Sequence, residues 1–139
     1  MAIGLLCTLS LTPALADPGS PVGIWRTFDI ESGTPKNLVQ ITEENGVLSG
    51  QIIELLDASE NSCSKCKGDL ADQPLKGLTI LSGLDRQGDQ WSGGTILRPT
   101  TGAEAKASLK LIDGGSRLEV TGTRGLMSRT QIWERAIND

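Results

Sequence analysis

The sequence contains no histidine and no tyrosine, and only three tryptophans and one phenylalanine among its 139 residues. Without histidine, no imidazole is available as the general base of a serine or cysteine nucleophile. Zinc sites usually need imidazoles, or more thiolates than the three cysteines of this chain supply. Hydrolase chemistry of the usual kind is therefore excluded. We predict no catalytic residues, no metal and no cofactor, and we expect the protein not to be an enzyme.

The scarcity of aromatic residues also limits the core, which must be built from leucine, isoleucine, valine and alanine. Such a core is feasible, because a domain of about 120 residues buries roughly two thirds of its unfolded surface. A net charge of −4 and a pI near 4.8 argue against nucleic acid as a partner. Beyond the N-terminus, no segment of the sequence is apolar enough over sufficient length to cross a membrane.

The N-terminal residues have the pattern of a secretory signal peptide. Residues 2–11 form an uncharged, largely apolar run that is too short to span a bilayer. Ala14-Leu15-Ala16 then matches the small-x-small cleavage pattern. We therefore expect a signal peptide over residues 1–16, which removes Cys7, and one periplasmic or secreted domain over residues 17–139. A buried N-terminal strand or helix is the alternative.

Turn residues recur about every ten residues along the rest of the chain, which is typical of an antiparallel meander. Asn45-Gly46, between two apolar-bearing stretches, is the strongest short signal for a β-hairpin. Another turn is predicted over 85–89, and Gly93-Gly94 inside a strand predicts a bulge or bend. The eight predicted strands are Gly23–Ile30, Leu38–Glu43, Val47–Leu55, Leu78–Leu84, Gln90–Leu97, Ala103–Leu111, Arg117–Thr123 and Arg129–Arg135.

Several of these strands alternate between apolar and polar residues. In the stretch 103–111, alanine and leucine occupy one face, while Glu104 and lysines share the other with Ser108. A period of two with one polar face indicates half-buried strands. Eight such strands avoid exposed edges by closing on themselves. We therefore predict an all-β fold, an eight-stranded antiparallel up-and-down barrel, with a two-sheet sandwich as the alternative.

Such a barrel is either filled with side chains or holds one small ligand. The small inward-facing residues Ala103, Ala105 and Ala107 favour spare volume, unless large side chains opposite fill it.

The two ends of the predicted meander carry a second pattern. Gly23-Ile24-Trp25, together with a basic residue in the last strand, resembles the signature of lipocalin-like (calycin-type) barrels. In those proteins the tryptophan closes one end of the barrel and an arginine packs across it. The first and last strands of a closed barrel pair antiparallel, so Arg135 is the preferred partner for Trp25 and Arg129 the second choice. Cation–π packing would stabilise the pair.

A longer set of motifs resembles the bacterial exported family called domain of unknown function 2147. The motifs are Gly23-x-Trp25-x-Thr27-x-Asp29, Glu43-x-Asn45-Gly46-x-Leu48-x-Gly50-x-Ile52, Cys63-x-x-Cys66-Lys67-Gly68-x-Leu70, Pro74-x-x-Gly77, Trp91-x-Gly93-Gly94-x-Ile96 and Arg129-Thr130-Gln131-x-Trp133-x-Arg135. The resemblance covers nearly the whole predicted mature chain and implies a periplasmic or secreted lipocalin-like barrel without an established activity. The chain departs from the family pattern at Ile30, Arg98, Ala105 and Thr123, where two usual acidic and two usual aromatic residues are replaced. These changes predict a roomier or differently shaped interior.

Cys63 and Cys66 are the only cysteines expected in the mature chain. In an oxidising compartment a structural disulfide is the favoured interpretation. A redox-active dithiol is the second, because Lys65 and Lys67 would lower a thiol pKa. No βαβ pattern of the thioredoxin kind surrounds the pair, however. A contribution to a metal site is the third interpretation.

Three classes of function are consistent with these features. The first is a binding module whose barrel holds a small apolar or amphipathic ligand, lined partly by Trp25, Phe28, Trp91 or Trp133. The second is an envelope interaction protein with a filled barrel that presents the cysteine loop to a partner of unknown identity. The third is thiol–disulfide redox activity. For each tryptophan, ordinary core packing is the competing interpretation.

Overall fold

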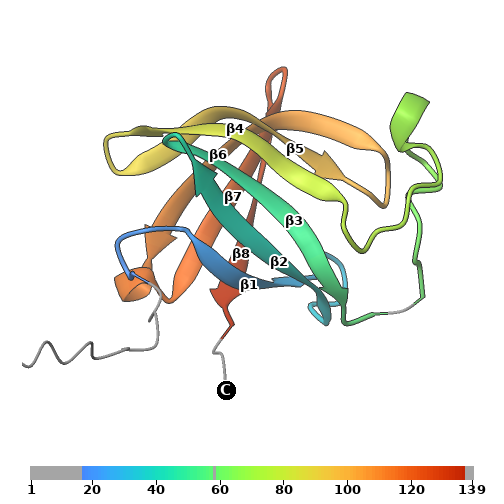
Figure 1. Ribbon diagram of the computed structural model, residues 1–139, viewed down its shortest axis with the longest axis horizontal. Coiled ribbons are helices and arrows are strands. Elements are labelled where there is room, and N and C mark those ends of the chain that lie inside the picture. Colours follow the sequence, from blue (N-terminus) through green and yellow to red (C-terminus); the bar gives the residue numbers. More distant parts are fainter. Residues whose placement is uncertain (1–16, 58, 137–139) are drawn as a thin grey trace, which may run out of the picture.

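A computed structural model describes residues 17–57 and 59–136 and shows a closed antiparallel barrel (Figure 1). The strands are β1 (Gly23–Phe28), β2 (Pro35–Glu44), β3 (Val47–Leu55), β4 (Thr79–Gln87), β5 (Gln90–Arg98), β6 (Ala103–Ile112), β7 (Arg117–Arg124) and β8 (Met127–Arg135). Each strand pairs with its neighbours in sequence, and β8 pairs with β1. The predicted eight-stranded up-and-down barrel is confirmed, and the alternative of a two-sheet sandwich is wrong. The predicted signal peptide lies outside the described residues.

Most strand boundaries follow local turn chemistry. Between β2 and β3, Asn45 and Gly46 have φ values of 54° and 82°, the positive values that a type I′ hairpin requires. Strand β1 ends at Phe28 because the Asp29 carboxylate accepts backbone hydrogen bonds of 2.9 Å from both Glu31 and Ser32. The turn predicted over 85–89 is too long, because β4 continues to Gln87 and only two residues separate it from β5.

The barrel interior is largely aliphatic, and all three tryptophans are buried in it. Strand β5 contains a register shift between Trp91 and Gly94, which agrees with the bulge predicted from the glycine pair. A Cβ atom at Gly94 would overlap the Ser82 carbonyl oxygen of β4, so only glycine permits this approach of the two strands. The bulge changes which face of β5 points inward: Trp91 pairs with Leu109, whereas Gly94 pairs with Ala107.

The two ends of the barrel differ. At one end lie the short β2–β3 and β4–β5 hairpins, the N-terminal segment and a 3-10 helix, η2 (Asp113–Gly115). At the other end lie the β1–β2, β5–β6 and β7–β8 turns and the long β3–β4 connection with the helix η1 (Gly68–Leu70). Figure 1 shows this connection at one side of the barrel, and its buried residues Cys63, Cys66 and Leu75 belong to the core. We call the first the closed end and the second the open end, because the cavity described below opens at the second.

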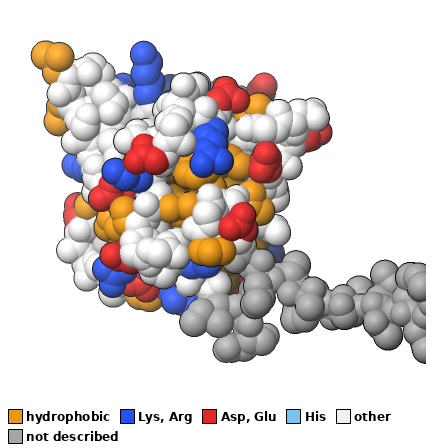
Figure 2. Space-filling model, turned by 90° about the vertical axis from the view of Figure 1, so that its left-hand side faces the viewer, with side chains coloured by type: hydrophobic (Ala, Val, Ile, Leu, Met, Phe, Trp, Pro, Cys, Tyr) orange, Lys and Arg blue, Asp and Glu red, His pale blue; other side chains and the backbone are white. Residues whose placement is uncertain are grey.

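The outer surface carries charges of both signs. On the face shown in Figure 2, acidic and basic side chains are interspersed around apolar atoms, and that face shows no large patch of one sign among the described residues. Two apolar side chains of the β7–β8 hairpin, Leu126 in the turn and Met127 at the start of β8, are strongly exposed. The described residues contain no helix that is long and apolar enough to span a membrane.

Candidate functional site

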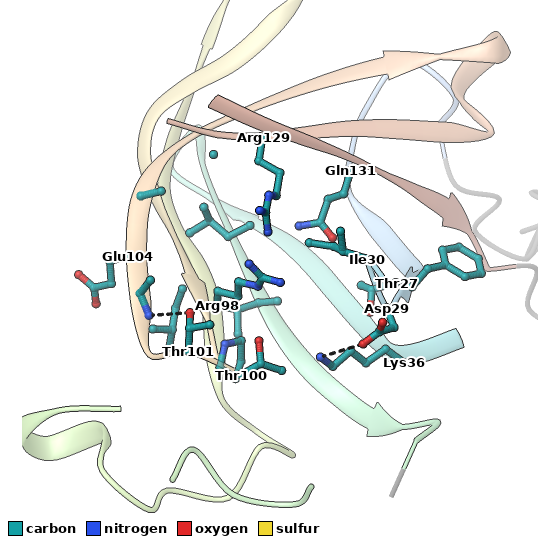
Figure 3. A pocket seen from close by; sticks show the side chains of 18 of the residues that line it. Thr27, Asp29, Ile30, Lys36, Arg98, Thr100, Thr101, Glu104, Arg129 and Gln131 are labelled. Atoms are coloured by element: carbon teal, nitrogen blue, oxygen red, sulfur yellow. Dashed lines mark hydrogen bonds and ion pairs between the residues drawn. The ribbon is translucent and has the colours of Figure 1, made fainter. Parts of the chain in front are cut away.

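The open end of the barrel contains a cavity of about 710 Å³ (Figure 3). Its wall comes from the ends of β1, β5 and β7, from β8, from the starts of β2, β4 and β6, and from the β1–β2 and β5–β6 turns. The lining residues are Thr27, Phe28, Asp29, Ile30, Glu31, Lys36, Asn37, Ile80, Ile96, Leu97, Arg98, Pro99, Thr100, Thr101, Ala103, Glu104, Ala105, Gly122, Arg124, Met127, Ser128, Arg129, Gln131 and Trp133. This volume falls within the range of about 300–1,000 Å³ that is usual for small-molecule sites.

The space exists because the inward positions of two neighbouring strands carry small residues. Ala103 and Ala105 of β6 line the cavity, and Gly122 of β7 lies beside them. A Cβ atom at Gly122 would be in van der Waals contact with the side chains of Ala105 and Ile96, both at 3.4 Å, so a side chain larger than alanine there would have to extend into the cavity. Ala107, one inward position deeper, is buried outside the cavity. The residues at this end therefore leave the volume that the alanine pattern predicts.

Two polar pairs lie in the wall below the mouth. The Thr27 hydroxyl accepts a 3.2 Å hydrogen bond from the Asn37 backbone N–H, and its Oγ1 lies 3.4 Å from the Asn37 carbonyl oxygen. The indole N–H of Trp133 donates to the Gln131 side-chain oxygen at 3.1 Å. These contacts hold the polar atoms of Thr27 and Trp133 in place and leave the Trp133 ring as apolar surface. The cavity is thus apolar at depth, with a few fixed polar groups.

The mouth of the cavity carries most of its charge. The Asp29 carboxylate lies 4.0 Å from the Lys36 ammonium group. Backbone hydrogen bonds from Ser32 and Glu31 to this carboxylate, more than the lysine, lower the pKa of Asp29 below its ordinary value. Figure 3 shows the side chains of Arg98 and Arg129 pointing into the cavity from β5 and β8.

Sequence reasoning did not predict these two arginines as cavity residues. The sequence contained a signal for Arg129, because Arg129, Gln131 and the buried Trp133 are spaced two residues apart and so share one face of β8. No such signal was available for Arg98. In the sequence, Arg98 stands out only as a departure from a family pattern.

Of the four aromatic residues predicted to contact a ligand, Phe28 and Trp133 line the cavity. Trp25 and Trp91 do not, so their assignment to the ligand cavity is corrected. Both lie near the closed end, where Trp25 is fully buried and Trp91 almost so. The Arg86 guanidinium lies 5.5 Å from the centre of the Trp91 ring. These two tryptophans are core residues, as the competing interpretation had it.

At the closed end, the Arg135 guanidinium lies 4.4 Å from the centre of the Trp25 ring. The Trp25 indole N–H donates to the Pro21 carbonyl oxygen at 2.8 Å. The Arg135 side chain donates to the carbonyl oxygens of Gly115, Val22 and Ser20 at 2.9, 3.1 and 2.8 Å. Partial burial lowers the pKa of this arginine, but it remains charged. Arg129, the second candidate, lies at the open end.

A model of one protein family matches residues 23–135, which include all eight strands and the cavity. The family is described as an uncharacterized protein conserved in bacteria, DUF2147. The chain belongs to the DUF2147 family. No curated protein sequence matches it.

A solved structure resembles this DUF2147 barrel. Protein HP1028 from Helicobacter pylori, described as belonging to the lipocalin family, superimposes with a TM-score of 0.74 and 22% sequence identity. The match covers 86% of this chain and 84% of that chain. At this identity the likeness shows the fold alone. It agrees with the lipocalin-like architecture that the resemblance implied.

The cysteine loop of the DUF2147 chain, residues 59–73, packs against the β5–β6 turn beside the mouth. Cys63 and Cys66 form a disulfide, with Cα atoms 5.3 Å apart. Cys63 Sγ lies 3.8 Å from the Pro99 carbonyl oxygen, and Leu97, which is 6% exposed, borders both the cavity and a smaller hollow beside Cys66. Cys63 itself is fully buried. Thiol–disulfide exchange needs access to a sulfur atom, so this geometry favours a structural disulfide over a redox-active one.

Metal binding has no support in the part of the chain that the structure describes. There, no group of three or more histidine, cysteine, aspartate or glutamate side chains is placed to hold an ion.

Proposed function

We propose that this protein is an exported binding protein that holds a small amphipathic molecule in the open end of its barrel. The observation that carries the proposal is the cavity of about 710 Å³, formed where the inward positions are small and the opposite end is closed by Trp25. Its deeper wall is apolar and its mouth is charged. A molecule with an apolar body and a polar group matches that gradient.

Export is supported by two independent features. The sequence predicts a signal peptide over residues 1–16. The described chain contains a disulfide between Cys63 and Cys66, and disulfides persist mainly in oxidising compartments such as the periplasm or the extracellular space. We therefore place the binding function in the periplasm or outside the cell.

The two other function classes have less support. A filled barrel that presents the cysteine loop to a partner does not fit the hollow open end. A redox enzyme needs an accessible sulfur atom, whereas Cys63 and Cys66 are 0% and 7% exposed.

The test is native mass spectrometry of gently purified protein, combined with titration of the neutral fluorescent probe N-phenyl-1-naphthylamine. We expect a retained small-molecule mass and saturable probe binding. Ala105→Phe, which fills the cavity, should abolish both. Ala71→Phe is the matched control, because Ala71 is exposed and lies outside the cavity lining. An apo mass together with no probe binding, or equal binding by Ala105→Phe, would refute the proposal.

A further inference from the structure

The mouth of the cavity contains two guanidinium groups that converge. Arg98 is the last residue of β5 and Arg129 lies near the start of β8, so the two approach from different sides of the barrel. Figure 3 shows their side chains pointing toward one another in the cavity. Arg98 is half-buried and Arg129 is exposed. Two like charges that approach each other repel, and water around the exposed one weakens this repulsion without removing it.

No acidic partner relieves this repulsion among the described residues. Neither Arg98 nor Arg129 has a carboxylate within 4.0 Å or a side-chain hydrogen bond there. Of the three carboxylates that line the cavity, Asp29 is paired with Lys36, and neither Glu31 nor Glu104 forms an ion pair with the two arginines. Figure 3 shows the Glu104 carboxylate directed away from them. The chain as a whole carries a net charge of −4. Unpaired positive charge in its cavity is therefore a local feature and does not reflect the overall composition.

The wall beneath the two arginines is apolar. Ile96 lies one inward position deeper than Arg98, and Ala105 pairs with it on β6. On β8, Trp133 lies four residue steps from Arg129, which corresponds to about 13 Å along a strand. The cavity thus offers cationic donors at its mouth and an apolar floor below them.

We propose that Arg98 and Arg129 bind the anionic head group, a carboxylate or a phosphate, of an amphiphile whose apolar part lies against Ile96, Ala105 and Trp133. This inference rests on the proposed function and specifies the charge of the ligand. An anion between the two guanidinium groups replaces their mutual repulsion by two attractions. Arginine is well suited to this role, because its planar fork forms paired hydrogen bonds with carboxylate or phosphate oxygens.

The test compares ligands with the same apolar chain and different head groups. Decanoate, decyl phosphate and decanol are titrated into the mature protein, each as a competitor of bound N-phenyl-1-naphthylamine. We expect one or both anionic ligands to bind about 10- to 100-fold more tightly than decanol, because decanol cannot form the charged hydrogen bonds to the two arginines. That preference should decrease at high salt. The relative affinities of decanoate and decyl phosphate identify the head group.

The double variant Arg98→Gln/Arg129→Gln should bring the anion-to-alcohol affinity ratio close to one. Arg26→Gln is the matched control: Arg26 lies between the buried Trp25 and Thr27 on the outward side of β1 and should keep the wild-type ratio. Equal affinities for decanol and the anions would overturn this inference and leave the proposed function standing. No binding of any ligand would overturn both. Inorganic phosphate that binds as tightly as decyl phosphate would overturn the role of the apolar chain.

Discussion

The contact between Arg135 and Trp25 gives a quantitative prediction for the stability of the barrel. Arg135→Ala removes a cation–π contact worth about 0.5–2 kcal/mol. It also removes the donors to the carbonyl oxygens of Gly115, Val22 and Ser20. A hydrogen bond to a charged group contributes about 1.5–3 kcal/mol when it is well shielded.

Arg135 is half-buried and the released carbonyl groups can bind water, so these contributions do not add in full. We therefore expect Arg135→Ala to lower the free energy of unfolding by about 3 kcal/mol. For a domain of this length, that loss corresponds to a decrease in Tm of roughly 10 °C. The stability of Arg135→Lys should lie between that of the wild type and that of Arg135→Ala. Lysine keeps the charge, but it lacks the planar guanidinium that donates to several carbonyl oxygens at once.

The assay is urea unfolding followed by tryptophan fluorescence, with the m value checked for constancy. Arg129→Ala is the control with the same chemical change. Arg129 lies at the open end without a contact to Trp25. We expect Arg129→Ala to lower the free energy of unfolding by less than about 0.5 kcal/mol. Equal destabilisation by the two variants, or a loss below about 0.5 kcal/mol for Arg135→Ala, would refute the reasoning.

Three further predictions concern the cysteine loop, export and pH. Cys63→Ser/Cys66→Ser should stay folded, because a bridge across so short a loop contributes at most about 2 kcal/mol. Hydrogen exchange should show faster opening confined to residues 59–73, and global unfolding of the variant would contradict the prediction. N-terminal sequencing of the exported protein should begin at Asp17, and a mature chain that begins at Met1 would contradict export. Hydrogen bonds lower the pKa of Asp29 in the folded protein. The ionised carboxylate therefore stabilises the fold at pH values above its unfolded pKa of about 3.9. This stabilisation is lost as the pH falls through the lower pKa of the folded state. The stability advantage of the wild type over Asp29→Asn should therefore disappear in acid unfolding measurements, and an advantage that grows with acidity would contradict the assignment.

Much of the fold could be predicted because its determinants are local. The type I′ hairpin needs only Asn45-Gly46, and the alternation along β6 needs only its own residues. Strand ends were less predictable: β4 extends through charged residues that resemble a turn, because pairing with β5 continues to Gln87. That pairing depends on a second strand, which the local composition of β4 does not reveal.

The site could be predicted only in part. Alternation counted from Trp91 would turn Arg98 outward, but the bulge at Gly94 restores it to the inward side. Arg129 could be recognised as inward-facing because it lies on the same face of β8 as the buried Trp133. Its approach to Arg98, however, depends on closure of the barrel. The reason that Trp25 and Trp91 miss the cavity is similar, since depth along the barrel axis depends on the register of all eight strands.

The difference between the two barrel ends has a consequence for how such a protein can change over time. The cation–π contact and the carbonyl network lie at the closed end, whereas the cavity residues lie at the other. Substitutions around the mouth therefore leave the main determinants of folding untouched, and distant sites contribute to stability almost independently. A lineage can acquire a new specificity at the rim without first accumulating compensating stabilising mutations. The same separation makes this barrel a practical scaffold for engineered binding.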